Sequence, residues 1–159
     1  MFHQQRYDGT REQNYESVIR QLQSLLDGEP DPIANLANAA ALLKQFMDDI
    51  NWVGFYLHRD GMLVLGPFQG LPACVRIPLG KGVCGKAALE RTTVRVADVH
   101  EFPGHIACDA ASLSEIVVPV VVRGELYGVL DIDSPIRSRF DETDQHNLER
   151  FVAKLGEYL

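Results

Sequence analysis

The 159-residue sequence has only three cysteines, one tryptophan and no apolar run long enough to span a bilayer. Its first six residues, Met-Phe-His-Gln-Gln-Arg, lack the apolar core of a signal peptide. Basic residues are also scarce, because 15 Lys and Arg oppose 22 Asp and Glu for a net charge of −7. Nucleic acids and anionic membrane surfaces attract basic faces. We therefore expect a cytoplasmic protein that binds neither.

The three cysteines are Cys74, Cys84 and Cys108, and their spacing is wide and irregular. The sequence contains no Cys-x-x-Cys pair with a histidine at ligand spacing, which argues against a zinc site. In a reducing compartment, cysteines serve catalysis or metal binding more often than permanent bridges. An odd number of scattered thiols is more typical of a nucleophile with one or two resolving partners.

Apolar periodicity predicts two N-terminal helices, over 12–27 and from Pro32 to about residue 47 after an Asp31 N-cap. The second helix has an apolar stripe that consists of Ile33, Leu36, Ala40, Leu43 and Met47. A last helix follows the Asp141 cap, with Leu148, Phe151, Val152 and Leu155 on its apolar face. All three helices are expected to pack in a core without chemical roles.

Between these helices, runs of β-forming residues predict strands over 51–57, 62–65, 74–79, 116–122 and 126–133. Asp60-Gly61 is a hairpin signal, the stretch 66–72 interrupts the strand pattern, and Pro119 indicates a strand end or a bulge. A short helix ends near Arg91. The element order predicts one α+β domain over 1–159: a central antiparallel sheet, helices packed from both chain ends and a loop-covered pocket.

The segment 96–115 carries Cys108, two histidines and four carboxylates, and it contains Pro103 and Gly104. A loop of this length inside a compact domain is usually a binding or active-site loop. The residues alone leave two interpretations of Cys108 open. It is either a small packed hydrophobe or a reactive thiol.

Strand alternation places Trp52 and Tyr56 on one face, around Gly54, where they can line a pocket or simply pack. Asp131 and Asp133 share a face near the end of the last strand. Burial of two neighbouring acids raises at least one pKa, which supplies a proton donor near neutral pH. The alternative is a strand end that is simply solvated.

The stretch 80–86, Gly-Lys-Gly-Val-Cys-Gly-Lys, matches neither the phosphate-binding loop nor the dinucleotide-binding pattern. A glycine-rich turn into a helix still offers free N–H groups to an anion. A ligand carboxylate or phosphate is therefore a candidate occupant of this turn.

Several motifs together resemble the GAF domain, and within it the free methionine-(R)-sulfoxide reductases. The motifs are Asn-Trp-Val-Gly-Phe-Tyr at 51–56, Gly-Pro-Phe-Gln-Gly at 66–70, Cys74 with Arg76 and Ile77, Gly-Val-Cys-Gly at 82–85, Val-Ala-Asp-Val at 96–99, Phe-Pro-Gly-His-Ile-Ala-Cys-Asp at 102–109, Ser-Glu-Ile-Val-Val-Pro at 114–119 and Gly-Val-Leu-Asp-Ile-Asp-Ser at 128–134. The match covers essentially the whole chain and all three family cysteines.

This resemblance implies reduction of free methionine-(R)-sulfoxide to methionine, with thioredoxin as reductant and a homodimer as the assembly. It implies Cys108 as nucleophile, Cys74 as the main resolving thiol and Cys84 as an auxiliary one. Glu115, Asp131 and Asp133 match the family's pocket acids, and Trp52 and Tyr56 match its substrate-side aromatics.

The chemistry of sulfoxide reduction requires a thiolate to attack sulfur while the oxygen gains a proton, and then a second thiol to condense with the sulfenic acid. This scheme uses neither a metal nor an organic cofactor. The residues do not decide whether Cys74 or Cys84 resolves, or which acid donates the proton. Two other hypotheses compete: a non-catalytic GAF sensor for a small molecule, and a redox switch that signals to a partner.

Overall fold

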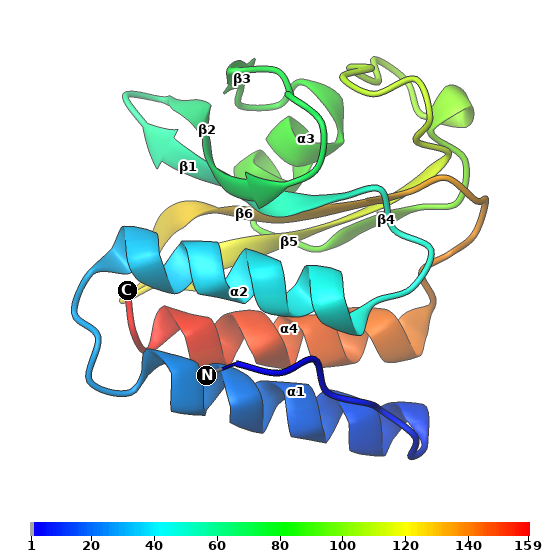
Figure 1. Cartoon of the computed structure of the whole chain (residues 1–159). Helices are drawn as coiled ribbons and strands as arrows, with labels where there is room; N and C mark the ends of the chain where they lie inside the picture. Colours follow the sequence, from blue (N-terminus) through cyan, green and yellow to red (C-terminus); the bar gives the residue numbers. More distant parts are fainter. Residues whose placement is uncertain (1) are drawn as a thin grey trace.

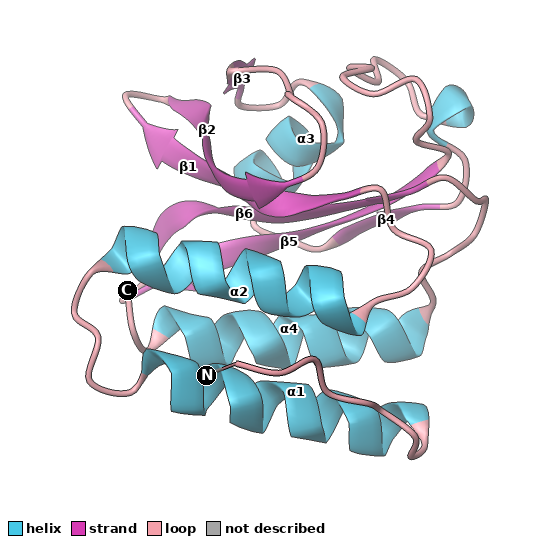
Figure 2. Ribbon diagram, viewed as in Figure 1, coloured by secondary structure: helices cyan, strands magenta, loops and turns pink. Residues whose placement is uncertain are grey.

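Six strands and four helices make up the computed structural model, which describes residues 2–159 (Figures 1 and 2). The strands are β1 (Trp52–Arg59), β2 (Met62–Gln69), β3 (Arg76–Pro78), β4 (Val94–Val96), β5 (Ser114–Val122) and β6 (Glu125–Ser134). The helices are α1 (Arg11–Leu26), α2 (Pro32–Phe46), α3 (Gly82–Glu90) and α4 (Glu142–Gly156), with a short 3₁₀ helix, η1, at Val99–Glu101. All pairings are antiparallel, in the order β3-β2-β1-β6-β5-β4. The predicted α+β class is confirmed.

Three helices cover one face of the sheet. α2 and α4 lie directly against it, and α1 packs beneath them as a further layer (Figure 1). The caps predicted at Asp31 and Asp141 are present, since each side chain accepts hydrogen bonds from backbone N–H groups of the first turn. The main apolar core fills this side of the sheet, with Val53, Phe55 and Leu57 of β1 pointing into it. This face therefore provides a rigid base for the chain.

The opposite face is covered by α3 and by the loops around it (Figure 2). A second apolar cluster lies here and includes Trp52, Tyr56, Leu63, Ile77 and Val83. The predicted alternation of β1 is confirmed, because its odd and even side chains enter two different cores. None of the helices within residues 2–159 combines the length and the apolar character that crossing a membrane requires.

Two strand predictions were wrong in extent. β2 continues through Gly66 and Pro67 to Gln69, although these residues were expected to interrupt the strand. The partner strand β3 pairs only with the first residues of β2, up to Val64. Gly66 and Pro67 fall in an irregularity of the β1–β2 register, between the pairs Tyr56–Leu65 and Gly54–Phe68, where a proline's missing N–H removes no ladder bond. β3 itself spans three residues rather than the predicted 74–79.

β4, a three-residue edge strand that pairs with Glu115, Ile116 and Val117, was not predicted from the sequence. Pro119 neither ends β5 nor forms a bulge, since it pairs with Val129 and the irregularity falls one residue later, between Val120 and Val121. Ile33 was expected in the α2 core but is 48% exposed, and it lies in the first turn of the helix, ahead of the buried residues Asn35 and Leu36.

Candidate active site

A cavity of about 560 Å³, its open mouth included, lies between the sheet and the segments that cover its second face. Seven of the eight side chains singled out from the sequence line this cavity: Trp52, Tyr56, Cys84, Cys108, Glu115, Asp131 and Asp133. The eighth, Cys74, is bonded to Cys108. The structure thus brings the predicted site residues together from β1, α3, β5, β6 and two loops.

Strand register explains how the three acids meet. Asp133 of β6 pairs with Glu115 of β5 on one side and with Trp52 of β1 on the other. Asp131, two residues earlier on β6, points to the same face. The sheet therefore presents three carboxyl groups and an indole side by side on the cavity floor.

The aromatic wall depends on a glycine between its two members. Trp52 stacks on Tyr56 and on Phe68, with ring centroids 5.9 and 5.2 Å apart. A β-carbon on Gly54 would lie 2.3 Å from Cβ of Phe68, so any side chain at this position would displace β2. The glycine gap noted in the sequence is required for this close approach.

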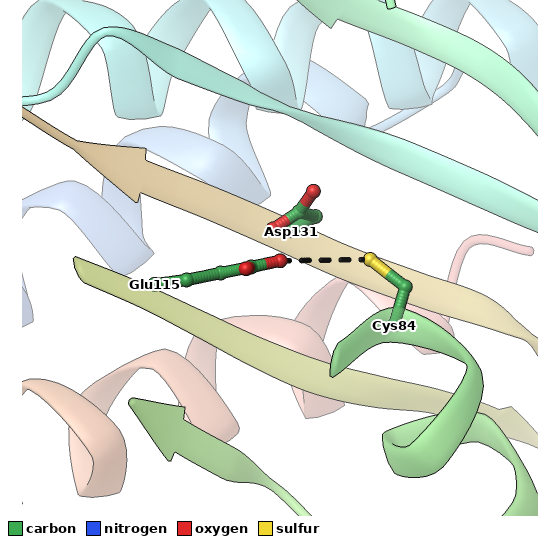
Figure 3. Close-up of side chains that lie close together, drawn as sticks. All are labelled: Cys84, Glu115 and Asp131. Carbon is green, nitrogen blue, oxygen red and sulfur yellow. Dashed lines mark hydrogen bonds between the residues drawn. The ribbon is translucent and has the colours of Figure 1, made fainter. Parts of the chain in front are cut away.

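Cys84 and two acids form the centre of the floor (Figure 3). The Cys84 thiol donates a hydrogen bond to Oε1 of Glu115, with 3.8 Å between sulfur and oxygen. Asp131 lies beside them, so that one donor atom from each residue falls within 4.8 Å of the others. All three side chains are buried.

This burial controls the ionisation of the floor. It raises the pKa of Asp131 to about 6. Burial, with the neighbouring carboxylates as a second cause, raises the pKa of Glu115 and of Asp133 well above the ordinary values of these groups. The pKa of the Cys84 thiol is raised for the same reasons. These shifts favour the protonated form of the floor carboxyls, the form that the sequence-based prediction requires of at least one of them.

These raised pKa values also bear on metal binding. Cys84, Glu115 and Asp131 are the one group of candidate ligands found close together within residues 2–159. Metal ligands must be deprotonated, whereas this environment favours the protonated forms. We assign no metal to the cluster.

A disulfide joins Cys74 to Cys108, with 5.7 Å between the two Cα atoms, while Cys84 remains a free thiol. Aromatic side chains of the wall hold the segment before and around Cys74. The Tyr56 hydroxyl donates to the carbonyl of Cys74 (2.8 Å), and the Trp52 indole N–H donates to the carbonyl of Leu71 (3.1 Å). The wall thus positions one of the two bonded cysteines.

Asn51 anchors the other cysteine's loop, a role that the sequence analysis missed. Its side-chain N–H₂ donates to Oδ2 of Asp109 (2.9 Å) and to Oγ of Ser112 (3.0 Å). Asp109 directly follows Cys108, so these bonds tie the loop to the start of β1. In the sequence, Asn51 stands out only because it directly precedes Trp52 and the first strand. That position does not reveal which residues its side chain contacts.

The carboxylates expected around Cys108 are distributed differently. Asp98 pairs with Arg137 at 2.9 Å, which lowers the pKa of that carboxyl. Asp109 accepts from Asn51, and Glu115 lies on β5 rather than in the loop. The buried acids Glu115 and Asp131 therefore lie beside Cys84 rather than in the loop that carries Cys108.

Two more features border the cavity. His105, in the loop, places Nε2 3.7 Å from Oε2 of Glu115. The start of α3 contributes Lys81, Gly82 and Val83 to the lining, and no side chain caps this helix end. Its free N–H groups agree with the anion-binding turn suggested by the sequence.

Comparison with known proteins places this geometry in a family. The GAF domain family matches residues 31–159. The free methionine-R-sulfoxide reductase of Escherichia coli is 53% identical over 145 residues, which is 91% of this chain and 88% of that protein. An X-ray structure of free methionine-R-sulfoxide reductase from Neisseria meningitidis in complex with its substrate superposes with a TM-score of 0.94 at 44% identity, covering 99% of this chain and 95% of the other. The substrate complex of the Staphylococcus aureus enzyme superposes with a TM-score of 0.89 at 52% identity. This match covers 98% of this chain and 99% of the other.

Proposed function

Because this chain belongs to the GAF-domain family of free methionine-(R)-sulfoxide reductases, we propose that it reduces free methionine-(R)-sulfoxide to methionine by cysteine chemistry. The observation that carries the proposal is a disulfide between Cys74 and Cys108 beside a floor of three acids whose pKa values are raised by burial. Sulfoxide reduction needs these two parts together.

In the first step, the Cys108 thiolate attacks the sulfoxide sulfur while a carboxyl group of the floor gives its proton to the oxygen. Methionine leaves, and the oxygen stays on Cys108 as a sulfenic acid. Cys108 is the proposed nucleophile because it is exposed in the cavity wall, whereas Cys84 is buried and its pKa is raised.

In the second step, the Cys74 thiol condenses with the sulfenic acid, which forms the disulfide and releases water. The pairing in the structure supports Cys74 over Cys84 as the resolving thiol. Cys84 keeps an auxiliary role as the hydrogen-bond donor to Glu115.

The cavity offers a complementary surface for each end of the amino acid. The substrate's ammonium group lies among Glu115, Asp131 and Asp133, where Asp131, with a pKa of about 6, supplies the balancing negative charge at neutral pH. The substrate's carboxylate accepts from the free N–H groups that begin α3. Its apolar part lies against the ring of Trp52, with Tyr56 beyond it. In a peptide-bound methionine sulfoxide, neutral peptide groups replace the ammonium and the carboxylate, so neither charged contact would form.

Three further parts of the proposal follow from the family and from thiol chemistry. Thioredoxin reduces the disulfide by exchange, the reaction takes place in the cytoplasm, where thiols are kept reduced, and the working assembly is a homodimer. Sedimentation over a range of protein concentrations tests the last point, and a concentration-independent monomer would contradict it.

The decisive assay combines the protein with thioredoxin, thioredoxin reductase, NADPH and free methionine-(R)-sulfoxide, and follows NADPH loss. We expect turnover, its abolition in Cys108→Ser, and one intact turnover without recycling in Cys74→Ser. Loss of that first turnover in Cys74→Ser would exchange the two roles. Binding of the sulfoxide without any turnover would instead identify a small-molecule sensor.

A further inference from the structure

The proposed reaction takes a proton from a buried floor, and this proton has to be replaced in every cycle. Glu115 and Asp131 are 5% and 6% exposed. Apolar and aromatic side chains surround them on the second face of the sheet. Both acids line the open cavity, so a molecule bound there separates them from bulk water, and a side chain that reaches both the floor and the solvent then provides a second route for protons.

His105 occupies this intermediate place. Its Nε2 lies 3.7 Å from Oε2 of Glu115, and its side chain is 16% exposed, compared with 6% for the side chain of Glu115. The other oxygen of Glu115 accepts from Cys84, so the thiol and the imidazole contact opposite oxygens of one carboxyl group (Figure 3 shows the thiol side). Contacts of this length in a free enzyme commonly tighten to hydrogen bonds once substrate is bound.

The titratable groups that line the cavity together with His105 come from several elements. They are Glu115 on β5, Cys84 on α3, Lys81 just before α3, Asp131 and Asp133 on β6 and Asp109 in the same loop, and His100 of η1 acts on the charge of His105. Burial, and secondarily His100, lowers the pKa of His105, while burial raises the pKa of Glu115. The pKa values of the two groups are therefore shifted toward each other, which favours proton transfer in both directions.

We propose that His105 is a proton-relay residue, which carries a proton from solvent to Glu115 and so restores the acid floor after each turnover. The proposal rests on the proposed reductase function and deepens it. One proton leaves Cys108 for solvent when the thiolate forms, and one returns through His105 to the floor. The cycle therefore has no net proton change beyond the formation of water.

The test uses full-length His105→Ala under saturating thioredoxin. Methionine formed in the first turnover should equal that of wild type, because the raised pKa of Glu115 favours its protonated form before the first cycle begins. Steady-state turnover should then fall by about 10²-fold, the lower range for loss of acid–base assistance. Added imidazole should restore much of it, and alkylation should trap the slow enzyme with Cys74 and Cys108 as free thiols.

His146→Gln is the matched control, since it removes an exposed histidine of α4 that does not line the cavity. It should keep wild-type turnover. His105→Gln conserves size and polarity but cannot titrate. Its pH–rate profile should lose the inflection caused by His105, while its unfolding temperature stays near that of wild type.

Two results would overturn the relay. One is an equal loss in the first and later turnovers without imidazole rescue, which would assign His105 a structural role. The other is an unchanged pH profile in His105→Gln. Failure of the reductase function itself is distinguishable, because wild-type enzyme would then show no turnover at all.

Discussion

At the scale of single residues, Asp131 combines a functional position with a cost in stability. It is buried, and its Oδ1 has no hydrogen-bond partner among the described residues. Burial raises its pKa from 3.8 to about 6. An unsatisfied buried carboxyl is unfavourable for folding, and such groups persist in proteins where a ligand uses them.

The pH dependence of stability tests this cost. Above pH 6, Asp131 is charged in both the folded and the unfolded chain, so its burial penalty is fully present. As pH falls from 6 toward 4, the folded protein takes up a proton that the unfolded chain does not, and stability rises. We expect Asp131→Asn to raise the free energy of unfolding by about 3 kcal/mol at pH 7, with the gain lost near pH 4.

Urea unfolding of the oxidised protein at several pH values measures this difference. The exposed Asp8→Asn is the control and should leave the curve unchanged. A gain in Asp131→Asn that is the same at pH 4 and pH 7 would refute the electrostatic explanation.

At the scale of elements, one side-chain amide ties the loop that carries Cys108 to the start of β1. Asn51 holds Asp109 and Ser112 through two hydrogen bonds from one amide group. Loss of both hydrogen bonds should lower the free energy of unfolding by about 2 kcal/mol and release the loop from β1. We expect Asn51→Ala to slow disulfide formation while leaving the secondary structure intact.

Hydrogen exchange resolves this effect by segment. Amides of residues 105–112 should exchange faster in Asn51→Ala, while those of β5 and β6 keep their protection. Asn14→Ala, which removes comparable bonds to the Tyr7 and Gly9 carbonyls far from the cavity, is the control. Equal loop protection in Asn51→Ala and wild type would show that the anchor is unimportant.

The same elements show what a sequence can and cannot predict. Alternation assigned Trp52 and Phe55 to their correct faces, because strand geometry is local. The continuation of β2 past Pro67 and the existence of β4 depend on which neighbouring edges are free, and this is a tertiary property. Likewise, the Cys74–Cys108 pairing and the contacts of Asn51 and His105 join segments that only the folded sheet brings together.

At the scale of the whole molecule, the disulfide lies among exposed apolar side chains. Leu71 and Val75, on either side of Cys74 in sequence, are 64% and 60% exposed, and Ile106 of the opposite loop is 36% exposed. Leu71 and Ile106 line the cavity that also contains Cys108. On the proposed function, this rim is where a protein reductant makes contact.

A charged side chain placed on the rim should slow disulfide reduction by a protein but not by a small dithiol. We expect Val75→Lys to reduce the rate of disulfide reduction by thioredoxin about tenfold, the effect of losing some 1.4 kcal/mol of contact. Reduction by dithiothreitol should be unchanged, because a small dithiol needs no docking surface. Ile136→Lys, at an exposed apolar residue outside the cavity lining, is the control. Equal slowing with both reductants would point to a distorted disulfide.

The two bonded loops also limit what can enter. The segments with Cys74 and Cys108 come within 5.7 Å of each other at their Cα atoms in the oxidised protein, above a floor that is closed by the sheet. An oxidised residue inside a polypeptide has chain continuing in two directions, and both would have to leave through this mouth. A single amino acid has no such tails. On the proposed function, the molecule repairs the building block before it is incorporated into protein, and oxidised residues within finished proteins are left to other enzymes.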